Sequence, residues 1–354
     1  MKRLIPSILL VVALFTSCKQ QNDNTVEIGA IVPLTGTVAT NGEAFMKGLE
    51  MGVEDANLNG GIQLKLNVED CRSTAKDAHT AYRKLKGQGI KYFIGLGGQF
   101  VAGFASETNN SDEILFASAT PNSTLLQMTN RCFRVFPTVD MVTDKICEYI
   151  DSVGANKIAI AYMQFEAYSM YYENILTKLK SSGKNVVYTE GYDPANRDFK
   201  GIVNKLASTH VDILYTAGAG ESSSVLTRQL FGNPRTANIP VVGDMNFSNP
   251  ENLNIIGTIK APMCAIDNYI DPAFAERFVK KYNQNANSFA LYGYVIASLL
   301  EQAIDSMDKE YSTDDVYEYI RTHTFETVGG PISFNPETKE PNLQLIYKVT
   351  RPNE

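Results

Sequence analysis

The sequence predicts an α/β protein with two doubly wound parallel-sheet lobes that are joined by a three-stranded hinge. Apolar, β-branched runs of strand length alternate with amphipathic, helix-period segments from Thr25 to about Met263. Near-continuous apolar strands are typical of parallel sheets that are covered by helices on both faces. The alternation is interrupted in the middle of the chain, and 354 residues are enough for two domains.

The N-terminal segment predicts a signal peptide of residues 1–17. Lys2 and Arg3 precede an apolar run over 4–15, which is too short to cross a bilayer as a stable helix. Small residues then precede Cys18, and the segment resembles a lipoprotein signal peptide. That resemblance implies that Cys18 becomes the lipidated N-terminus and that residues 18–24 form a polar tether. The alternative is a buried helix that begins the fold.

The predicted strands share a β-branched, mostly apolar composition. They are Val26–Val32, Leu64–Glu69, Tyr92–Ile94, Ile114–Phe116, Lys157–Ala161, Val186–Glu190, Asp212–Tyr215, Ile239–Val242, Pro262–Ile266 and a last strand over Leu343–Val349.

The predicted helices carry apolar stripes at helical spacing, such as Phe45, Leu49 and Val53 in the first one. Gly60 is placed to end that helix in a left-handed conformation. Asp271 followed by a proline is a helix N-cap with proline in the first turn. The late helices are expected over Pro272–Gln284, Ser288–Asp308 and Thr313–Thr322.

Three passages of the chain predict the domain boundaries. The extended segment 131–140 contains a proline, strand–helix alternation stops near 267–271, and a Gly-Gly-Pro run at 329–331 precedes the last strand. We expect lobe 1 to contain residues 25–137 plus 268–325, and lobe 2 to contain residues 138–267 plus 326–354. Each lobe is then discontinuous in sequence.

Composition argues against several functions. The net charge is −7 and the sequence has no Lys/Arg block, so nucleic acid is not an expected partner. The three histidines and five cysteines show no metal-ligand spacing. The glycine-rich loop at 95–100 lacks the last glycine of a dinucleotide motif, and there is no P-loop or G-x-S-x-G. We therefore expect no catalytic residue, no metal and no cofactor.

Candidate binding residues follow the predicted strands, because ligands of parallel α/β sheets bind at the carboxyl ends of the strands. Ser118, Thr120 and backbone N–H groups near Gly98 can donate hydrogen bonds to a carboxylate. Asp244 or Glu221 from the second domain can hold an ammonium group. The alternative is that the hydroxyls cap helices and the carboxylates are solvated.

The chain resembles the type I periplasmic solute-binding proteins of the leucine/isoleucine/valine-binding class, in their lipoprotein form. The resemblance covers Val26–Val349 and is carried by the block at 28–62 beginning IGAIVPLTGT, and by KLKGQGIKYFIG, ASATPNSTL, CFRVFPT and RDFKGIVNKLASTHVDILY. It implies two lobes that clamp a small ligand and deliver it to an ABC importer.

The resemblance also implies a set of ligand-binding residues. Ser118, Ala119 and Thr120 match the segment that holds an α-carboxylate, Gly98 and Gln99 fall where a serine often helps it, and Asp244 lies near the residue that binds the ammonium. The remaining positions lie around the ligand: Asn41 and Ala219 where tyrosines are common, Tyr168 as the nearest aromatic in its loop, and Phe289 as a pocket wall.

These expectations describe an extracytoplasmic solute-binding component of an ABC importer that clamps an amino acid or a related small amide or carboxylate. Its partners are the ligand, an ABC permease, and the lipid bilayer through acylated Cys18. It is expected on the periplasmic or extracellular face of a bacterial membrane. The alternative is a lipoprotein that reports bound solute to a membrane receptor, and an enzyme on this scaffold is a third possibility.

Overall fold

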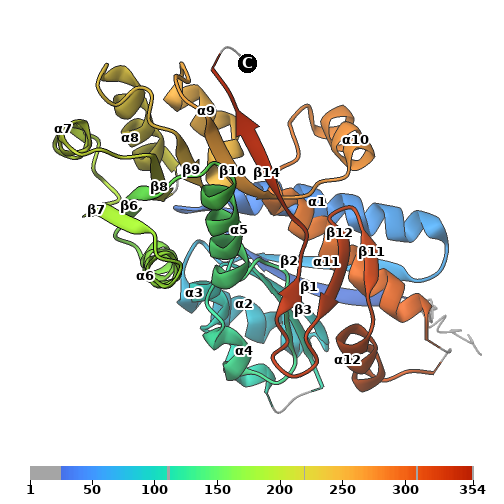
Figure 1. Ribbon diagram of the computed structural model, residues 1–354. Coiled ribbons are helices and arrows are strands. Elements are labelled where there is room, and N and C mark those ends of the chain that lie inside the picture. The colour runs from blue at the N-terminus through green and yellow to red at the C-terminus, as the bar shows by residue number, and fades with distance from the viewer. Residues whose placement is uncertain (1–24, 110–111, 219, 308–309, 353–354) are drawn as a thin grey trace, which may run out of the picture.

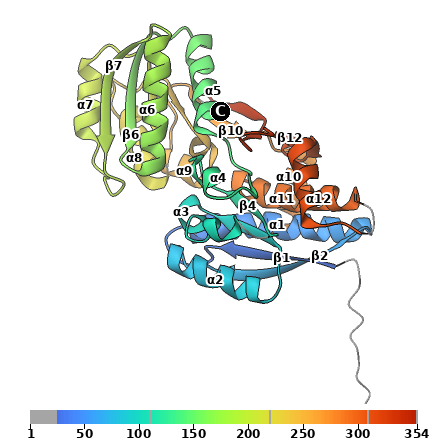
Figure 2. The same ribbon diagram turned by 90° about the horizontal axis from the view of Figure 1, so that it is seen from below.

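Two sheets form the centres of two bodies that lie side by side (Figure 1 and Figure 2). The computed structural model describes residues 25–109, 112–218, 220–307 and 310–352. The expected signal peptide, tether and Cys18 lie outside the described residues. This arrangement confirms the predicted fold class of two doubly wound sheets.

The first sheet is parallel throughout and has the strand order β2-β1-β3-β4-β5. Its strands are β1 (Thr25–Val32), β2 (Gln63–Asp70), β3 (Tyr92–Leu96), β4 (Ile114–Ser118) and β5 (Cys132–Arg134). One face packs against α1 (Ala39–Asn59), α11 (Ser288–Asp305) and α12 (Thr313–Thr322). The other face packs against α2 (Ala75–Gly87), α3 (Gly98–Val101) and α4 (Thr124–Met128).

The second sheet has the order β14-β10-β9-β8-β6-β7, and only β14 runs antiparallel to its neighbour. Its strands are β6 (Lys157–Met163), β7 (Asn185–Tyr192), β8 (Ile213–Ala217), β9 (Val241–Gly243), β10 (Met263–Asn268) and β14 (Leu345–Thr350). The helices α5 (Val139–Ser152) and α6 (Glu166–Ser181) cover one face. The other is covered by α7 (Lys200–Ser208), α8 (Gly220–Gly232) and α9 (Pro250–Ile256).

The chain passes between the two bodies three times, after β5, after β10 and before β14. After β10 it forms α10 (Pro272–Tyr282), which packs against α1. Asp271 caps α10 through a hydrogen bond from the Phe274 N–H at 3.0 Å, and Gly60 ends α1 at φ +82°. Both end signals that the sequence predicted are therefore confirmed.

The structure differs from the prediction in the segment before β14. We expected residues 326–354 in the second lobe, but β11 (Phe325–Thr327), β12 (Gly330–Phe334) and β13 (Pro341–Asn342) form a small antiparallel sheet on the first body. Ile332 and Phe334 lie in the core of the first sheet. The strands are short and bury few apolar side chains. Their sequence therefore does not indicate which of the two bodies they pack against. The other domain boundaries stay a prediction.

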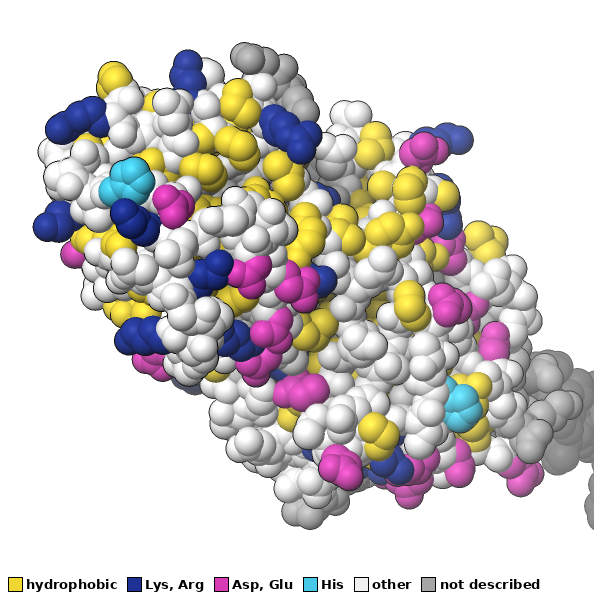
Figure 3. All heavy atoms as spheres, viewed as in Figure 1, with side chains coloured by type: hydrophobic (Ala, Val, Ile, Leu, Met, Phe, Trp, Pro, Cys, Tyr) yellow, Lys and Arg dark blue, Asp and Glu magenta, His cyan; other side chains and the backbone are white. Residues whose placement is uncertain are grey.

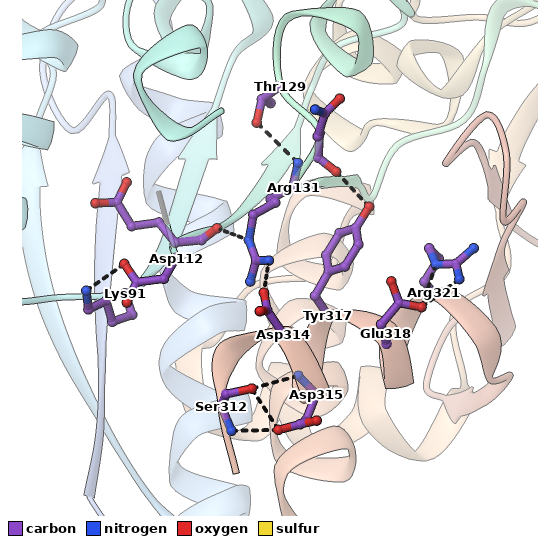
Figure 4. Close-up of polar contacts among 12 residues, drawn as sticks. Lys91, Asp112, Thr129, Arg131, Ser312, Asp314, Asp315, Tyr317, Glu318 and Arg321 are labelled. Carbon is purple, nitrogen blue, oxygen red and sulfur yellow. Dashed lines mark hydrogen bonds and ion pairs between the residues drawn. The ribbon is translucent and has the colours of Figure 1, made fainter. Parts of the chain in front are cut away.

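Helix α12 is fixed to the first body beside the amino ends of β4 and β5 (Figure 4). Arg131 pairs with Asp314 and lies 5.1 Å from the ring of Tyr317, whose hydroxyl donates to the Asn130 carbonyl oxygen at 2.7 Å. A capping box between Ser312 and the third helical residue begins α12. These contacts lie at the end of the first sheet opposite to the predicted ligand loops.

Surface charges of both signs are interspersed on the face shown in Figure 3. On α5 and α6 they form ion pairs, such as Lys178 with Asp144 at 2.6 Å.

Cys71, Cys132, Cys147 and Cys264 are all free, and three of them are buried. No helix in the described part of the chain is long and apolar enough to cross a membrane.

Helices α1 and α11 approach each other closely because glycine lies at their contact. A Cβ atom on Gly48 would lie 1.8 Å from the Ala290 carbonyl oxygen, and one on Gly293 would lie 2.2 Å from the Phe45 carbonyl oxygen. Helix α1 begins directly after the loop that follows β1, and Ser288, the first residue of α11, accepts a hydrogen bond at 2.9 Å from Asn268 at the second crossing of the chain.

We predict that Gly48→Ala lowers the free energy of unfolding by about 1–3 kcal/mol, since the added methyl group must push a backbone carbonyl aside. Urea denaturation followed by circular dichroism measures this change. Gly201 is the control: it lies in α7 with open space at its Cβ position, so Gly201→Ala should raise stability by about 0.5–1 kcal/mol. Equal effects of the two substitutions would contradict the close helix contact.

Candidate functional site

The first half of the candidate site is formed by the loops that follow β3 and β4. These strands are parallel neighbours, and Leu96 pairs with Ser118 at their carboxyl ends. The loops are joined by backbone hydrogen bonds, including Gly98 N–H to the Ala119 carbonyl oxygen at 3.3 Å. A Cβ atom on Gly98 would lie 2.5 Å from Thr120 Oγ1. Glycine is thus required for the two loops to come together.

The two candidate hydroxyls of this half differ in their surroundings. Ser118 is fully buried, and its hydroxyl donates to the Val135 carbonyl oxygen at 2.9 Å. The Thr120 hydroxyl makes only a long contact, 3.4 Å to the carbonyl oxygen of Asn122, among the residues that the structure describes. Its hydrogen is therefore the more available donor for a ligand, whereas that of Ser118 is used within the fold. The side chain of Gln99 is exposed.

The loop after β1 is held in place by Asp70 at the end of β2. The carboxylate of Asp70 accepts hydrogen bonds from the N–H groups of Leu34 at 2.9 Å and Thr35 at 3.2 Å, and from the Thr35 hydroxyl at 2.6 Å. These hydrogen bonds outweigh the effect of partial burial and lower the pKa of Asp70. The loop leads to Asn41, a half-buried residue in the first turn of α1.

The second half of the site is formed around Asp244, which directly follows β9. Asp244 is 7% exposed. Its Oδ1 accepts hydrogen bonds from the backbone N–H of Asn246 at 2.9 Å and from the side-chain amide of Asn246 at 2.7 Å. No ion pair among residues 25–109, 112–218, 220–307 and 310–352 includes Asp244. Burial raises the pKa of Asp244 to about 6, although the Asn246 hydrogen bonds oppose that change.

The negative charge of Asp244 acts on four buried tyrosines. Burial raises the pKa of each of them, and the negative charge of Asp244 contributes in every case; they are Tyr168, Tyr171, Tyr192 and Tyr215. The Tyr168 hydroxyl accepts a long hydrogen bond of 3.4 Å from the Asn246 side chain. Sequence reasoning chose Tyr168 from its loop and noted Tyr215 only as the aromatic nearest to Ala219, whereas Tyr171 and Tyr192 look like ordinary core residues.

Glu221, the other candidate for holding an ammonium, lies elsewhere. It forms an ion pair with Arg197 at 3.0 Å, and its side chain is 59% exposed. Its charge is therefore already paired at the surface, whereas the buried carboxylate of Asp244 has no ion-pair partner in the part of the chain that the structure describes. Ala219 lies outside the described residues.

Contacts between the two bodies bring these halves together. The Asn122 side-chain amide donates to Glu166 Oε1 at 3.3 Å, which links the loop after β4 to the first turn of α6. Met245, next to Asp244, packs against the core of the first sheet, as does Phe289 at the start of α11. The predicted ligand loops of the two bodies therefore face each other across this contact.

A buried polar network joins the bodies at the crossing after β10. The carboxylate of Asp267 accepts hydrogen bonds from Ser248 and from Ser288 at 2.7 Å, and pairs with Lys348 at 2.7 Å. The side chain of Asn268 donates to the Tyr292 hydroxyl at 2.7 Å. This network connects β10 and β14 of the second sheet to α11 of the first body, so it fixes the base of the candidate site.

A cavity of about 970 Å³ lies beside this site rather than in it. It lies between α5, α6 and the turn before β13, where Thr138, Asn174 and Glu340 line it. None of the predicted ligand residues within the described ranges lines this cavity. No cluster of three or more potential metal ligands occurs in the same ranges.

Comparison with known proteins supports the arrangement. A model of the periplasmic binding protein family matches residues 25–347. The "Leu/Ile/Val-binding protein homolog 3" of Brucella melitensis is 27% identical over 303 residues, which cover 82% of this chain and 80% of that protein.

Solved structures show the same fold. One is the branched-chain amino acid transporter substrate binding protein of Streptococcus pneumoniae in complex with isoleucine. It superposes with a TM-score of 0.76 at 19% sequence identity, and the match covers 93% of this chain and 100% of that protein's chain. Another is a solute binding protein of an ABC transporter from Rhodopseudomonas palustris in complex with 3,4-dihydroxybenzoic acid. Its TM-score is 0.78 at 16% sequence identity, and the match covers 92% of this chain and 93% of that protein's chain. The chain belongs to the periplasmic binding protein family, a family of extracytoplasmic solute-binding proteins.

Proposed function

We propose that this protein captures a small amino acid, or a related amine-bearing carboxylate, between its two bodies and delivers it to an ABC importer in the membrane. The observation that carries this proposal is the buried carboxylate of Asp244, which has no cation beside it among the described residues. A buried charge is costly unless it is paired, so a ligand that brings a cation relieves that cost.

The ligand's ammonium group is assigned to Asp244. At neutral pH this carboxyl is ionised, because its pKa of about 6 lies below 7. Asp244 is almost fully shielded from water, which strengthens a charge–charge contact with a ligand. Aromatic acids such as the ligand of the R. palustris protein carry no ammonium, so Asp244 favours amino acids over them.

The ligand's carboxylate is assigned to the loops after β3 and β4. The hydroxyl of Thr120 is the available side-chain donor, and Gly98 allows the backbone to approach the ligand closely. Relatives that are named for binding leucine, isoleucine and valine support an amino acid as ligand. Gln99 and Asn41 replace residues that are common in that class, so the ligand's own side chain need not be branched and apolar.

Binding is coupled to closure of the two bodies. A ligand that contacts Thr120 and Asp244 together has a higher affinity for the closed form than for the open form, and it shifts the population accordingly. The hydrogen bond between Asn122 and Glu166 forms across the same boundary. The permease is then proposed to recognise the closed form.

The proposal includes a membrane anchor at Cys18. A receptor-reporting lipoprotein would need the same anchor, so a permease gene beside this one, rather than a kinase gene, would favour transport. Residues 1–24 lie outside the described part of the chain, and the anchor rests on the sequence alone.

We predict that affinity for the amino acid ligand falls about tenfold per pH unit as the pH drops below about 6, because protonation removes the charge of Asp244. Isothermal titration calorimetry between pH 5 and 8 measures this, after a thermal-shift screen of the standard amino acids. In Asp244→Asn the pH dependence should vanish, and binding at pH 7.5 should weaken by about 2–5 kcal/mol.

The raised pKa of Asp244 also makes the stability of the unliganded protein depend on pH. Because the folded pKa of Asp244 is raised from 3.8 to about 6, the folded protein binds this proton more tightly than the unfolded chain does. The unliganded protein therefore loses stability as the pH rises from about 4 to 6, and Asp244→Asn should melt at a higher temperature than wild type at pH 7.5. A lower melting temperature would contradict a buried, unpaired carboxylate.

We predict that Thr120→Val weakens ligand binding about 10- to 150-fold, since a hydrogen bond to a charged group contributes about 1.5–3 kcal/mol. Ser118→Ala is the matched control, because its hydroxyl serves the Val135 carbonyl oxygen. It should lower stability but leave the calorimetric affinity within about threefold of wild type. A larger loss of affinity in Ser118→Ala than in Thr120→Val would reverse the assignment.

We predict that full-length protein expressed in bacteria incorporates an alkyne-labelled fatty acid at Cys18. Cys18→Ala should abolish the label and release the protein from the membrane fraction, since no other lipid-bearing group is proposed. Cys71→Ala is the control and should keep the label. Labelling that persists in Cys18→Ala would contradict the anchor.

A further inference from the structure

Arg134 is a buried cation directly beneath the ligand loop that follows β4. The residue is 0% exposed. Its Nη1 donates to the carbonyl oxygens of Thr120 at 3.1 Å and Pro121 at 2.8 Å, and its Nη2 pairs with the carboxylate of Glu340. Its Nε–H is buried and has no hydrogen-bond partner in the part of the chain that the structure describes. The guanidinium therefore holds two consecutive peptide groups of that loop.

The acidic partner is itself fixed in place. Lys339 precedes Glu340 and donates to the carbonyl oxygens of Leu126 at 2.8 Å and Thr129 at 2.9 Å. Two adjacent side chains of opposite charge thus attach the turn before β13 to the first body, Lys339 to the segment between β4 and β5 and Glu340 to the end of β5. The carboxylate of Glu340 is held at the position that the guanidinium of Arg134 requires.

The ion pair also joins two of the three crossings between the bodies. Arg134 is the last residue of β5, after which the chain enters the second body, and Glu340 comes shortly before the crossing into β14. The loop that Arg134 holds carries Thr120 toward the ligand and Asn122 toward Glu166 of the second body. A displaced guanidinium would therefore disturb both contacts.

We propose that Arg134 is a positioning residue of the ligand-binding site, whose guanidinium sets the backbone of Thr120 and Pro121 through the fixed carboxylate of Glu340. The inference rests on the proposed function in that it takes Thr120 as a ligand contact. The planar fork of arginine reaches two carbonyl oxygens and one carboxylate at the same time, which the single ammonium of lysine does not.

A role in stability alone does not account for this arrangement. Burying an ion pair usually gains little stability over apolar side chains of similar volume, because both charges lose their hydration. The contacts of Arg134 are also directed at two peptide groups of one loop and not at the sheet that surrounds it. What the guanidinium secures is the conformation of residues 120–121.

The test compares Arg134→Lys and Glu340→Gln with a matched control, Arg131→Lys. Arg131 lies three residues earlier and also combines an ion pair with a hydrogen bond to a carbonyl oxygen, but at the opposite end of the first sheet (Figure 4). Hydrogen–deuterium exchange of the unliganded proteins measures how often the amides of the loop at residues 119–124 become exposed. Calorimetry with each of the twenty standard L-amino acids measures the binding affinity.

Arg134→Lys and Glu340→Gln should speed amide exchange in residues 119–124 by about tenfold or more, with β1 and β3 unchanged. Both should weaken binding of the tightest amino acid by about tenfold or more. Arg131→Lys should change neither, even if it lowers the melting temperature equally. The inference would be overturned if, in Arg134→Lys, the amide exchange rate of residues 119–124 and the affinity for the amino acid both stay within about twofold of wild type.

The two readouts separate this inference from the proposed function. If no amino acid binds the wild-type protein, the proposed ligand class fails, and the exchange measurement still decides whether Arg134 positions the loop. If amino acids bind and the loop exchanges normally in both variants, the proposed function stands and the role of Arg134 is wrong.

Discussion

The three crossings of the chain between its two bodies are the constraint on which the candidate site depends. All strands of the first sheet and most of the second run parallel, so the carboxyl ends of the strands gather at one edge of each sheet. The crossings hold these two edges opposite each other, and the buried network of Asp267 joins them at the base. Loops that are distant in sequence, at Gly98, Thr120 and Asp244, therefore lie at the facing ends of the two sheets, where we propose one site.

Two buried charges near that site differ in how they are compensated. Arg134 is surrounded by carbonyl oxygens and the carboxylate of Glu340, so the fold itself satisfies most of its charge. Within the described ranges, Asp244 receives the two hydrogen bonds of Asn246 and no cation, and its pKa is raised. In the proposed site, the first body offers neutral hydrogen-bond donors, and the second body offers a negative charge that the cation of a ligand would pair.

The sequence predicts the fold well because its signals are local. Apolar strand runs, the N-cap at Asp271 and the left-handed glycine at Gly60 each act within a few residues, and the structure confirms them. The small sheet that contains Ile332 and Phe334 could not be assigned, since its place depends on which core has room for two apolar side chains.

The site was predictable only to the level of loops. Sequence places Ser118 and Thr120 together after β4, but which hydroxyl is already used depends on the Val135 carbonyl oxygen, a contact between neighbouring strands. Arg134 was visible only as one letter of the CFRVFPT motif, because its partner Glu340 lies 206 residues away in sequence.

The most direct measurement is a crystal structure of the mature protein with its tightest-binding amino acid. The account predicts the ligand between the two bodies, with its ammonium group against Asp244 and its carboxylate within hydrogen-bond distance of the Thr120 hydroxyl. A ligand in the cavity beside α5 and α6, or one that leaves Asp244 without a cation, would contradict it.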